Sequence, residues 1–194
     1  MPKKCPITGE SHCKCFHKTI LTAEKPTLKD TVRKLFTDHA AYTKFFIESF
    51  LNSSEDVKAI ENRLLQNQQD IGNAVKPIIG ITNGNQLTAL LTQHIILAAE
   101  VLNQLKQNNQ SKLKTAINNL FNNSEHVAEF LNSLNPQKLP LPAIADEFHQ
   151  HNQFVIDLAL LHSEKKWEEE VSCYDAYYNH MLHFADLIYQ ALKK

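Results

Sequence analysis

The chain has 194 residues, of which 43% are hydrophobic, and its 20 basic residues nearly balance 21 acidic ones. That length suits one domain with a substantial core, and the even charge offers no broad field to gather nucleic acid or an anionic membrane surface. With only four glycines and seven prolines for tight turns, a β-sandwich or barrel is disfavoured and an all-α fold is predicted.

No segment approaches the roughly 20 apolar residues that span a bilayer. The first residues, MPKKCPITGESHCKC, lack the apolar centre of a secretory signal. We therefore expect a cytoplasmic protein with no membrane span and no nucleic-acid partner. Its oligomeric state is left open.

Residues 1–26 are polar and show no sustained period, which predicts a flexible arm ahead of a helical-bundle domain at 27–194. Thiols and imidazoles in a short arm can bind a soft metal ion, so the arm holds a second candidate metal site. Its ligands would be Cys5, His12, Cys13, Cys15 and His17. Because the C-x7-C-x-C spacing matches no standard zinc module, a reduced, exposed tail is the alternative.

Apolar residues that recur at steps of three and four predict five long helices. They cover about residues 27–51, 55–76, 86–107, 143–163 and 165–192. Pro77 together with Gly80 is predicted to end the second helix, with a turn at 83–85. Between the third and fourth helices, residues 112–134 carry weaker repeats interrupted at 122–124, which predicts two short helices joined at a break. The whole is an up-and-down bundle.

Histidines interrupt the apolar rows near the midpoints of four helices, and an asparagine does so on the second. These residues are His39, Asn67, His94, His151 and His180. Antiparallel helices of similar length share their mid-height, so the five side chains are predicted to form one layer. Four flanking polar residues are expected to reach the same layer: Tyr42, Arg63, Asp70 and Asp175.

Several neutral imidazoles in a dry core are what a transition metal requires, with carboxylates orienting the rings from behind. The metal ligands would be His39, His94, His151 and His180, and the cofactor-binding neighbours Tyr42, Arg63, Asn67, Asp70 and Asp175. Ligation by several histidines and few acidic residues favours zinc, with copper or iron as alternatives. A di-iron centre is disfavoured because no helix carries an inward Glu-x-x-His pair. The partner is expected to be a metal ion or small molecule.

Two other interpretations remain open. The buried polar groups can satisfy one another and set the register of the bundle, with no metal bound. A histidine beside an aspartate can instead act as a general base, so the sequence leaves enzymatic activity undecided. Away from the layer, the run 168–170 of three glutamates is predicted to be a solvated first helical turn. Four other histidines, His126, His149, His162 and His183, do not combine an inward position with mid-height, so they rank below the five as site candidates.

Four segments carry a resemblance to known proteins. They are LFTDHAAYTKFFIESF (35–50), RLLQNQQDIGNAVKPIIG (63–80), LTALLTQHI (87–95) and YDAYYNHMLHFAD (174–186). On these segments the chain resembles a family of uncharacterised bacterial helical-bundle proteins, many of them exported and some carrying unreliable enzyme names. The resemblance implies a helical bundle with a polar site and implies no particular activity. The family's recurring polar residues would fall here on Asp38, His39, Arg63, Asn67, Gln68, Asp70, Gly72, Asn73, His94, His151, Asp175, His180 and Asp186.

Overall fold

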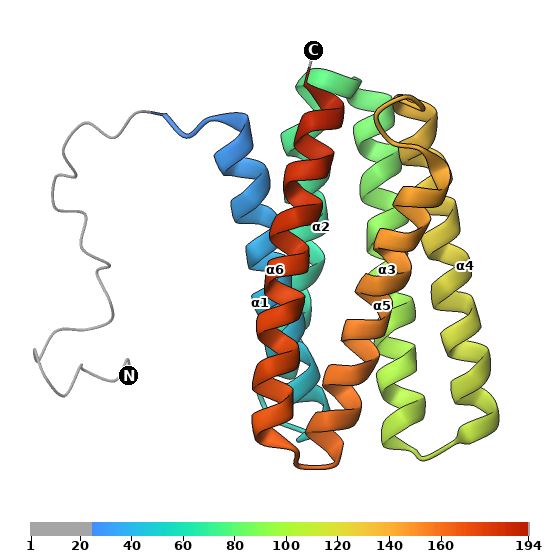
Figure 1. The fold of residues 1–194 in the computed structure, drawn as a ribbon. Helices are drawn as coiled ribbons and strands as arrows, with labels where there is room; N and C mark the ends of the chain where they lie inside the picture. Colours follow the sequence, from blue (N-terminus) through green and yellow to red (C-terminus); the bar gives the residue numbers. More distant parts are fainter. Residues whose placement is uncertain (1–24, 194) are drawn as a thin grey trace, which may run out of the picture.

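The computed structural model describes residues 25–193, so the candidate metal site in the arm lies outside the described residues. Residues 25–193 form helices and no strand, which confirms the all-α up-and-down bundle (Figure 1). The helices are α1 (Leu28–Leu51), α2 (Val57–Ile79), α3 (Ile81–Lys106), α4 (Gln110–Leu134), α5 (Leu141–Ser163) and α6 (Trp167–Leu192). No helix in this range is long and apolar enough to cross a membrane.

Helix α4 runs unbroken where two short helices were predicted, so the described residues form six long helices instead of five. Asn123 and Ser124, which suggested the break, are buried. Asn123 bonds to His94 on α3, and the Ser124 hydroxyl donates to the Leu120 carbonyl one turn back. Because partners in the packed bundle engage these side chains, they do not interrupt the helix.

A single residue connects α2 to α3. Of the two residues predicted to end α2, Gly80 does so and its φ of 88° suits glycine, whereas Pro77 lies inside the helix, which continues for two more residues after it. The turn predicted at 83–85 is also wrong, since these residues lie inside α3. A Cβ added to Gly84 would lie 3.1 Å from the Gly72 carbonyl oxygen. The two glycines therefore allow close approach of α2 and α3.

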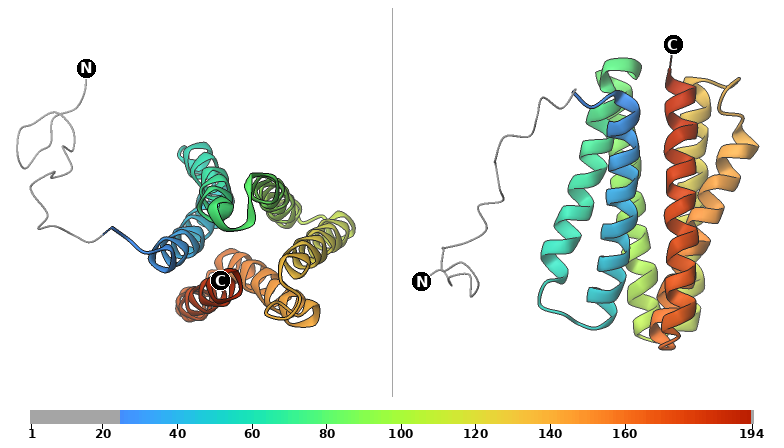
Figure 2. Two further views of the ribbon diagram at one scale, coloured as in Figure 1. Left: turned by 90° about the horizontal axis from the view of Figure 1, so that it is seen from above. Right: turned by 60° about the vertical axis from the view of Figure 1, so that its left-hand side comes forward.

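Each helix packs against its neighbours in chain order, and α6 returns to pack against α1, so the six helices form a ring (Figure 2). Inside this ring α1, α3 and α5 also contact one another. These three run in one direction and α2, α4 and α6 in the other (Figure 1). Any side chain at the centre of the bundle is therefore supplied mainly by α1, α3 and α5.

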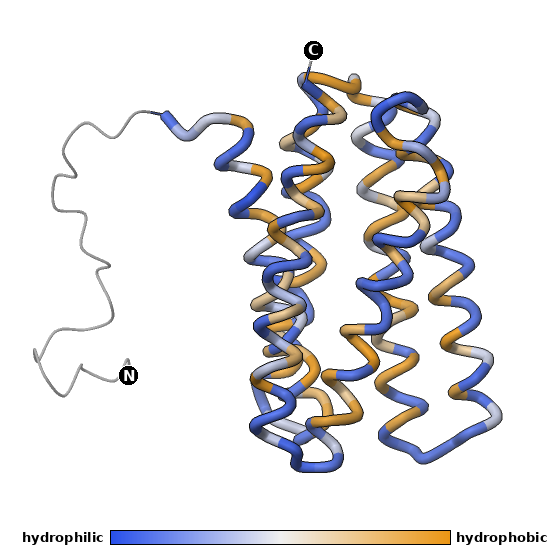
Figure 3. The backbone as a smooth tube through the Cα atoms, in the orientation of Figure 1, coloured by the Kyte–Doolittle hydropathy of each residue, from blue (hydrophilic) through white to orange (hydrophobic). Residues whose placement is uncertain are grey.

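Two apolar clusters divide the core along the bundle axis. The first includes Leu35, Val75 and Phe148 and lies toward the end where α1 begins, and the second includes Phe46 and Leu102. Hydrophobic and hydrophilic residues alternate along every helix, as expected of amphipathic helices around a shared core (Figure 3). The polar layer lies between the two clusters.

Candidate functional site

Three buried histidines meet at the centre of the bundle, one from each inner helix. His39 of α1 and His94 of α3 flank His151 of α5, with ring centroids 5.5 Å and 5.6 Å from it. His180 of α6 lies on a further side of His151, at 6.3 Å. The structure thus brings together the four histidines predicted as metal ligands, with His151 in the middle.

The same three inner histidines separate two internal cavities. The larger, of about 50 Å³, extends into the first apolar cluster and is lined largely by aliphatic and aromatic side chains. The smaller, of about 20 Å³, extends into the second cluster. His39, His94 and His151 are the residues that line both. The histidine layer is therefore a polar partition across an otherwise apolar interior.

The smaller cavity carries further polar groups. Thr43 and Asn152 line it together with the histidines. The Thr43 hydroxyl and the Asn152 carbonyl oxygen are buried and have no hydrogen-bond partner among the described residues, while the Asn152 amino group donates to Ser124 Oγ at 2.8 Å. A cavity of about this size holds one water molecule, which would serve both free oxygens.

Each inner imidazole is held through Nδ1 by a side chain of another helix. Gln68 Nε2 lies 3.1 Å from His39, Asn123 Oδ1 lies 2.9 Å from His94, and Met181 Sδ lies 3.3 Å from His151. Residues 25–193 supply no hydrogen bond to Nε2 of any of the three. Each inner ring is therefore bonded to another helix through one nitrogen only.

Burial keeps the layer neutral. It lowers the pKa of His39, His94 and His180 to about 4, and the proximity of His94 lowers that of His39 further. Burial and then the three neighbouring histidines hold the pKa of His151 well below 6.5. At neutral pH all four rings are uncharged, so each presents one N–H and one bare nitrogen.

Asn67 shares the height of the layer but does not line either cavity. Its amino group donates to the Leu35 carbonyl at 2.9 Å, and its carbonyl oxygen accepts from Gln68 at 3.2 Å. Gln68 also donates to the Leu64 carbonyl at 2.9 Å. Asn67 therefore positions Gln68, which in turn contacts His39.

Three other predicted site residues gather away from the layer, between α1 and α2. The Arg63 guanidinium lies 4.7 Å above the Tyr42 ring, 3.3 Å from the Asp38 carboxylate and 3.6 Å from that of Asp70. The Arg63 and Asp70 side chains are about one third exposed. These residues form a surface ion-pair group that contacts no buried histidine.

Asp175 lies exposed on α6, and the carboxylate beside His180 belongs to Glu147 of α5. One Glu147 oxygen lies 3.5 Å from His180 Nδ1, and the other lies 3.2 Å from Nε2 of the exposed His183. The sequence analysis missed Glu147, although Glu147 precedes His151 by one helical turn and therefore shares its helix face. It also missed Asn123, although Asn123 lies three residues after Leu120 and so continues the apolar row of its helix.

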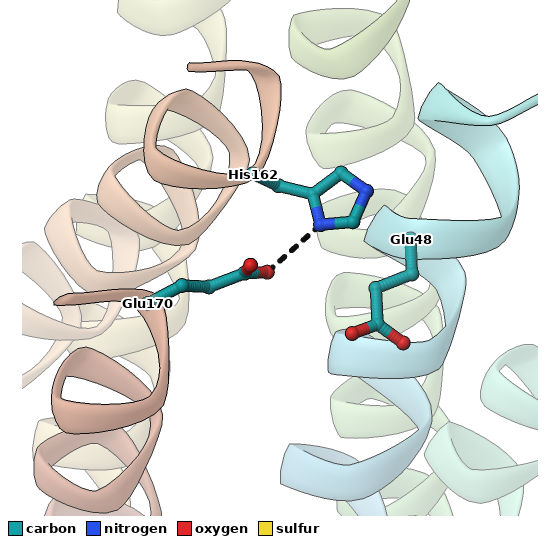
Figure 4. Close-up of side chains that lie close together, drawn as sticks. All are labelled: Glu48, His162 and Glu170. Atoms are coloured by element: carbon teal, nitrogen blue, oxygen red, sulfur yellow. Dashed lines mark hydrogen bonds and ion pairs between the residues drawn. The ribbon is translucent and has the colours of Figure 1, made fainter. Parts of the chain in front are cut away.

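A second buried polar group lies where α5 ends and α6 begins (Figure 4). Glu170, only 3% exposed, accepts from Lys44 Nζ at 2.7 Å and from His162 Nδ1 at 3.0 Å. Lys44 also contacts Glu48 on its own helix. The predicted solvated turn is therefore wrong for Glu170, and His162, which ranked below the five layer residues, is part of this buried cluster.

This end cluster is the one group within residues 25–193 whose three candidate metal-ligand atoms, from Glu48, His162 and Glu170, lie within 4.8 Å of one another. The Lys44 ammonium contacts both carboxylates and already supplies them with positive charge. We therefore interpret the end cluster as an ion-pair network. The four central histidines are close by ring distance but do not bring three ligand nitrogens within that range.

Comparisons with protein-family models, with curated proteins and with solved structures find no match to this chain. Function is therefore inferred from the chemistry of the central histidines and their cavities.

Proposed function

We propose that this protein binds a small, mainly apolar molecule inside the bundle, with the polar end of that molecule against the three inner histidines. One observation carries the proposal: the residues common to the two cavities are His39, His94 and His151. An apolar chamber that ends in a few convergent polar groups is the usual form of a small-molecule site.

The larger cavity favours an apolar body. Its lining includes Val75, Leu91 and Phe184, and the polar atoms come from the three histidines and Gln68. A space of about 50 Å³ corresponds to roughly three to five water molecules, each with about 30 Å³ of liquid volume, so it admits a compact molecule about the size of one small aromatic ring. Filling it restores dispersion contacts that the lining otherwise lacks.

The test uses the full chain and toluene as the first probe, with binding followed by thermal unfolding and by methyl NMR shifts. We expect toluene to raise the melting temperature, because a ligand that binds only the folded state stabilises it. Val75→Leu, which adds volume to the cavity wall, should weaken binding at least tenfold. Val101→Leu is the matched control, since Val101 is buried in a separate apolar cluster and lines neither cavity.

Absence of any shift with toluene and with similar small aromatic and alicyclic molecules, up to their solubility limits, would reject the proposal. Equal loss of binding in Val101→Leu would mean that the probe occupies another site.

A transition metal at the histidine layer is a second candidate, with zinc favoured and copper or iron as alternatives. Three features support it. The rings are neutral, and the ring centroids of His94 and His180 lie 5.6 Å and 6.3 Å from that of His151. The Nδ1 atom of each of these three rings also faces a side chain on another helix. Metal-bound histidines usually have such a partner at the second nitrogen. Small rotations of the rings would be needed to bring three nitrogens onto one ion.

Metal analysis of the full chain, purified without a histidine tag, separates the two candidates. The metal hypothesis requires stoichiometric ion, a zinc-dependent rise in melting temperature, and loss of both in His151→Phe. Clean apo-protein that zinc, copper and iron all fail to stabilise would reject it. The double variant Cys13→Ser, Cys15→Ser tests whether the arm is responsible for any metal that is found.

A further inference from the structure

Helix α6 carries a second apolar row on its outer surface. Trp167, Val171 and Tyr178 are 52%, 61% and 36% exposed, and the half-buried Tyr174 lies between them with its ring centroid 6.3 Å from that of Tyr178. Steps of four, three and four residues place these side chains, the outer row, on one side of the helix. Of the seven large hydrophobic residues exposed within residues 25–193, three therefore lie in this row.

The outer row is typical of a surface that packs against another helix. Apolar residues at alternating steps of three and four form the seam of a helix pair. The bundle already uses a different side of α6 for its core, formed by residues such as Tyr177, Met181 and Phe184. Single exposed hydrophobic residues are normal on a monomer, but a contiguous apolar patch indicates a contact surface. Helix α1 packs beside α6 and adds the exposed ring of Phe45 (Figure 2).

The charges on the face that α1 and α6 share differ between its two ends. Helix α6 contains no lysine or arginine, and Glu168 and Asp175 are exposed along its first half. The two helices run in opposite directions, so α1 begins at the other end of the face (Figure 1). There Lys29 and Arg33 share one carboxylate, that of Asp186, which leaves positive charge in excess.

We propose that this face binds a second copy of the chain, in a two-fold dimer whose bundles run antiparallel. A two-fold axis across the helices brings the outer rows together and sets the acidic start of α6 against the partner's basic start of α1. In a parallel dimer the acidic ends would meet and repel each other. An anionic membrane or nucleic acid is a poorer occupant, because α6 presents negative charge to it.

The face is large enough for a stable dimer. Helices of 24 and 26 residues are roughly 36–39 Å long, and two of them side by side are roughly 20 Å wide. That outline gives about 700 Å² for each copy, close to the roughly 800 Å² per partner of a standard interface. Tryptophan, tyrosine and arginine contribute most to such contacts, and the face offers Trp167, Tyr178 and Arg33.

Sedimentation velocity of the full chain, from micromolar to submillimolar concentration, tests the proposal. The wild type should sediment with twice the mass of one chain. Val171→Glu, which puts a charge into the outer row, should weaken dimerisation at least tenfold. Ile96→Glu is the matched control, since Ile96 is 51% exposed on α3, whose neighbours in the ring are α2 and α4, and it should leave the dimer intact. Unchanged circular dichroism of both variants excludes unfolding as the cause.

A charge exchange tests the antiparallel arrangement. Lys34 is 69% exposed near the start of α1, so Lys34→Glu should weaken the dimer by placing like charges near the partner's Glu168. Adding Glu168→Lys should restore most of the affinity. A monomer at every concentration, a dimer unaffected by Val171→Glu, or no recovery in the double variant would overturn the proposal. Binding to phosphatidylglycerol vesicles without self-association would also overturn it and assign the face to a membrane.

Discussion

The central histidines and the end cluster are two buried polar groups in one bundle, and their charges are balanced differently. In the end cluster Lys44 contacts Glu48 and Glu170, and Glu170 also bonds to His162. In the histidine layer the rings are neutral, each inner ring is held through one nitrogen, and the other nitrogen is left free beside a cavity.

From this difference we propose that the histidine layer is the ligand site and that the end cluster is structural. In the end cluster the Lys44 ammonium already contacts both carboxylates, so a metal ion there would have to displace Lys44. A layer of half-satisfied imidazoles next to empty volume is costly for folding alone, and a bound molecule can supply the missing bonds. Four experiments test this distinction.

Acidification should destabilise the protein through the histidine layer. The folded pKa of His39 and of His94 is about 4, below the usual 6.5, so between these values the unfolded chain binds more protons. Stability is therefore full above about pH 6.5 and falls as the pH drops toward 4, by about 2 kcal/mol for each of these two histidines at pH 5.

Urea unfolding at intervals between pH 4.5 and 8 measures this slope. His94→Leu should make it shallower, and substitution of the exposed His126 by glutamine should leave it unchanged. A slope that is the same in all three proteins would mean that the central histidines are not the groups that titrate.

Removal of the Glu170 charge should damage the end cluster. Glu170→Gln leaves Lys44 without its buried counter-ion and should lower the free energy of unfolding by about 3 kcal/mol. Glu48→Gln is the matched control, because the Glu48 side chain is 41% exposed, and its loss should cost less than about 1 kcal/mol. Chemical denaturation compares the two variants, and equal losses would contradict the ion-pair interpretation.

A double-mutant cycle measures the bond between His94 and Asn123. His94→Leu leaves the buried Asn123 oxygen without its donor and should cost about 1–3 kcal/mol. Adding Asn123→Leu removes that oxygen, so the double variant should lose less stability than the sum of the two single ones, by about 1 kcal/mol. Strict additivity would show that the contact between His94 and Asn123 adds nothing to the stability of the fold.

The smallest expected change in stability comes from two Val→Leu variants, one at the cavity wall and one in the packed core. Val75→Leu adds a methylene group to the cavity wall and should raise stability by about 0.5–1 kcal/mol. The same change at Val101, within a packed cluster, should lower it by about 1 kcal/mol. Thermal and urea unfolding of the two variants should therefore differ in sign. A loss at Val75 would mean that the chamber is already filled by its own side chains.

Amphipathic periods in the sequence were enough to predict the all-α bundle, the approximate position of each long helix and the central position of His39, His94, His151 and His180. These features depend on which residues share a helix face and a height, and both follow from local spacing. The break in α4 was predicted wrongly because Asn123 and Ser124 were judged without their partners on other helices. Only packing shows that such residues are satisfied inside a continuous helix.

The tertiary structure alone determined what the polar residues contact. Spacing placed Asp175 beside His180, but the rotation of α6 exposes Asp175 and leaves Glu147 of α5 as the neighbour. Burial of Glu170 depends on Lys44, 126 positions earlier in the chain. Each of these contacts is set by the relative rotation and register of neighbouring helices, which the period of a single helix does not encode.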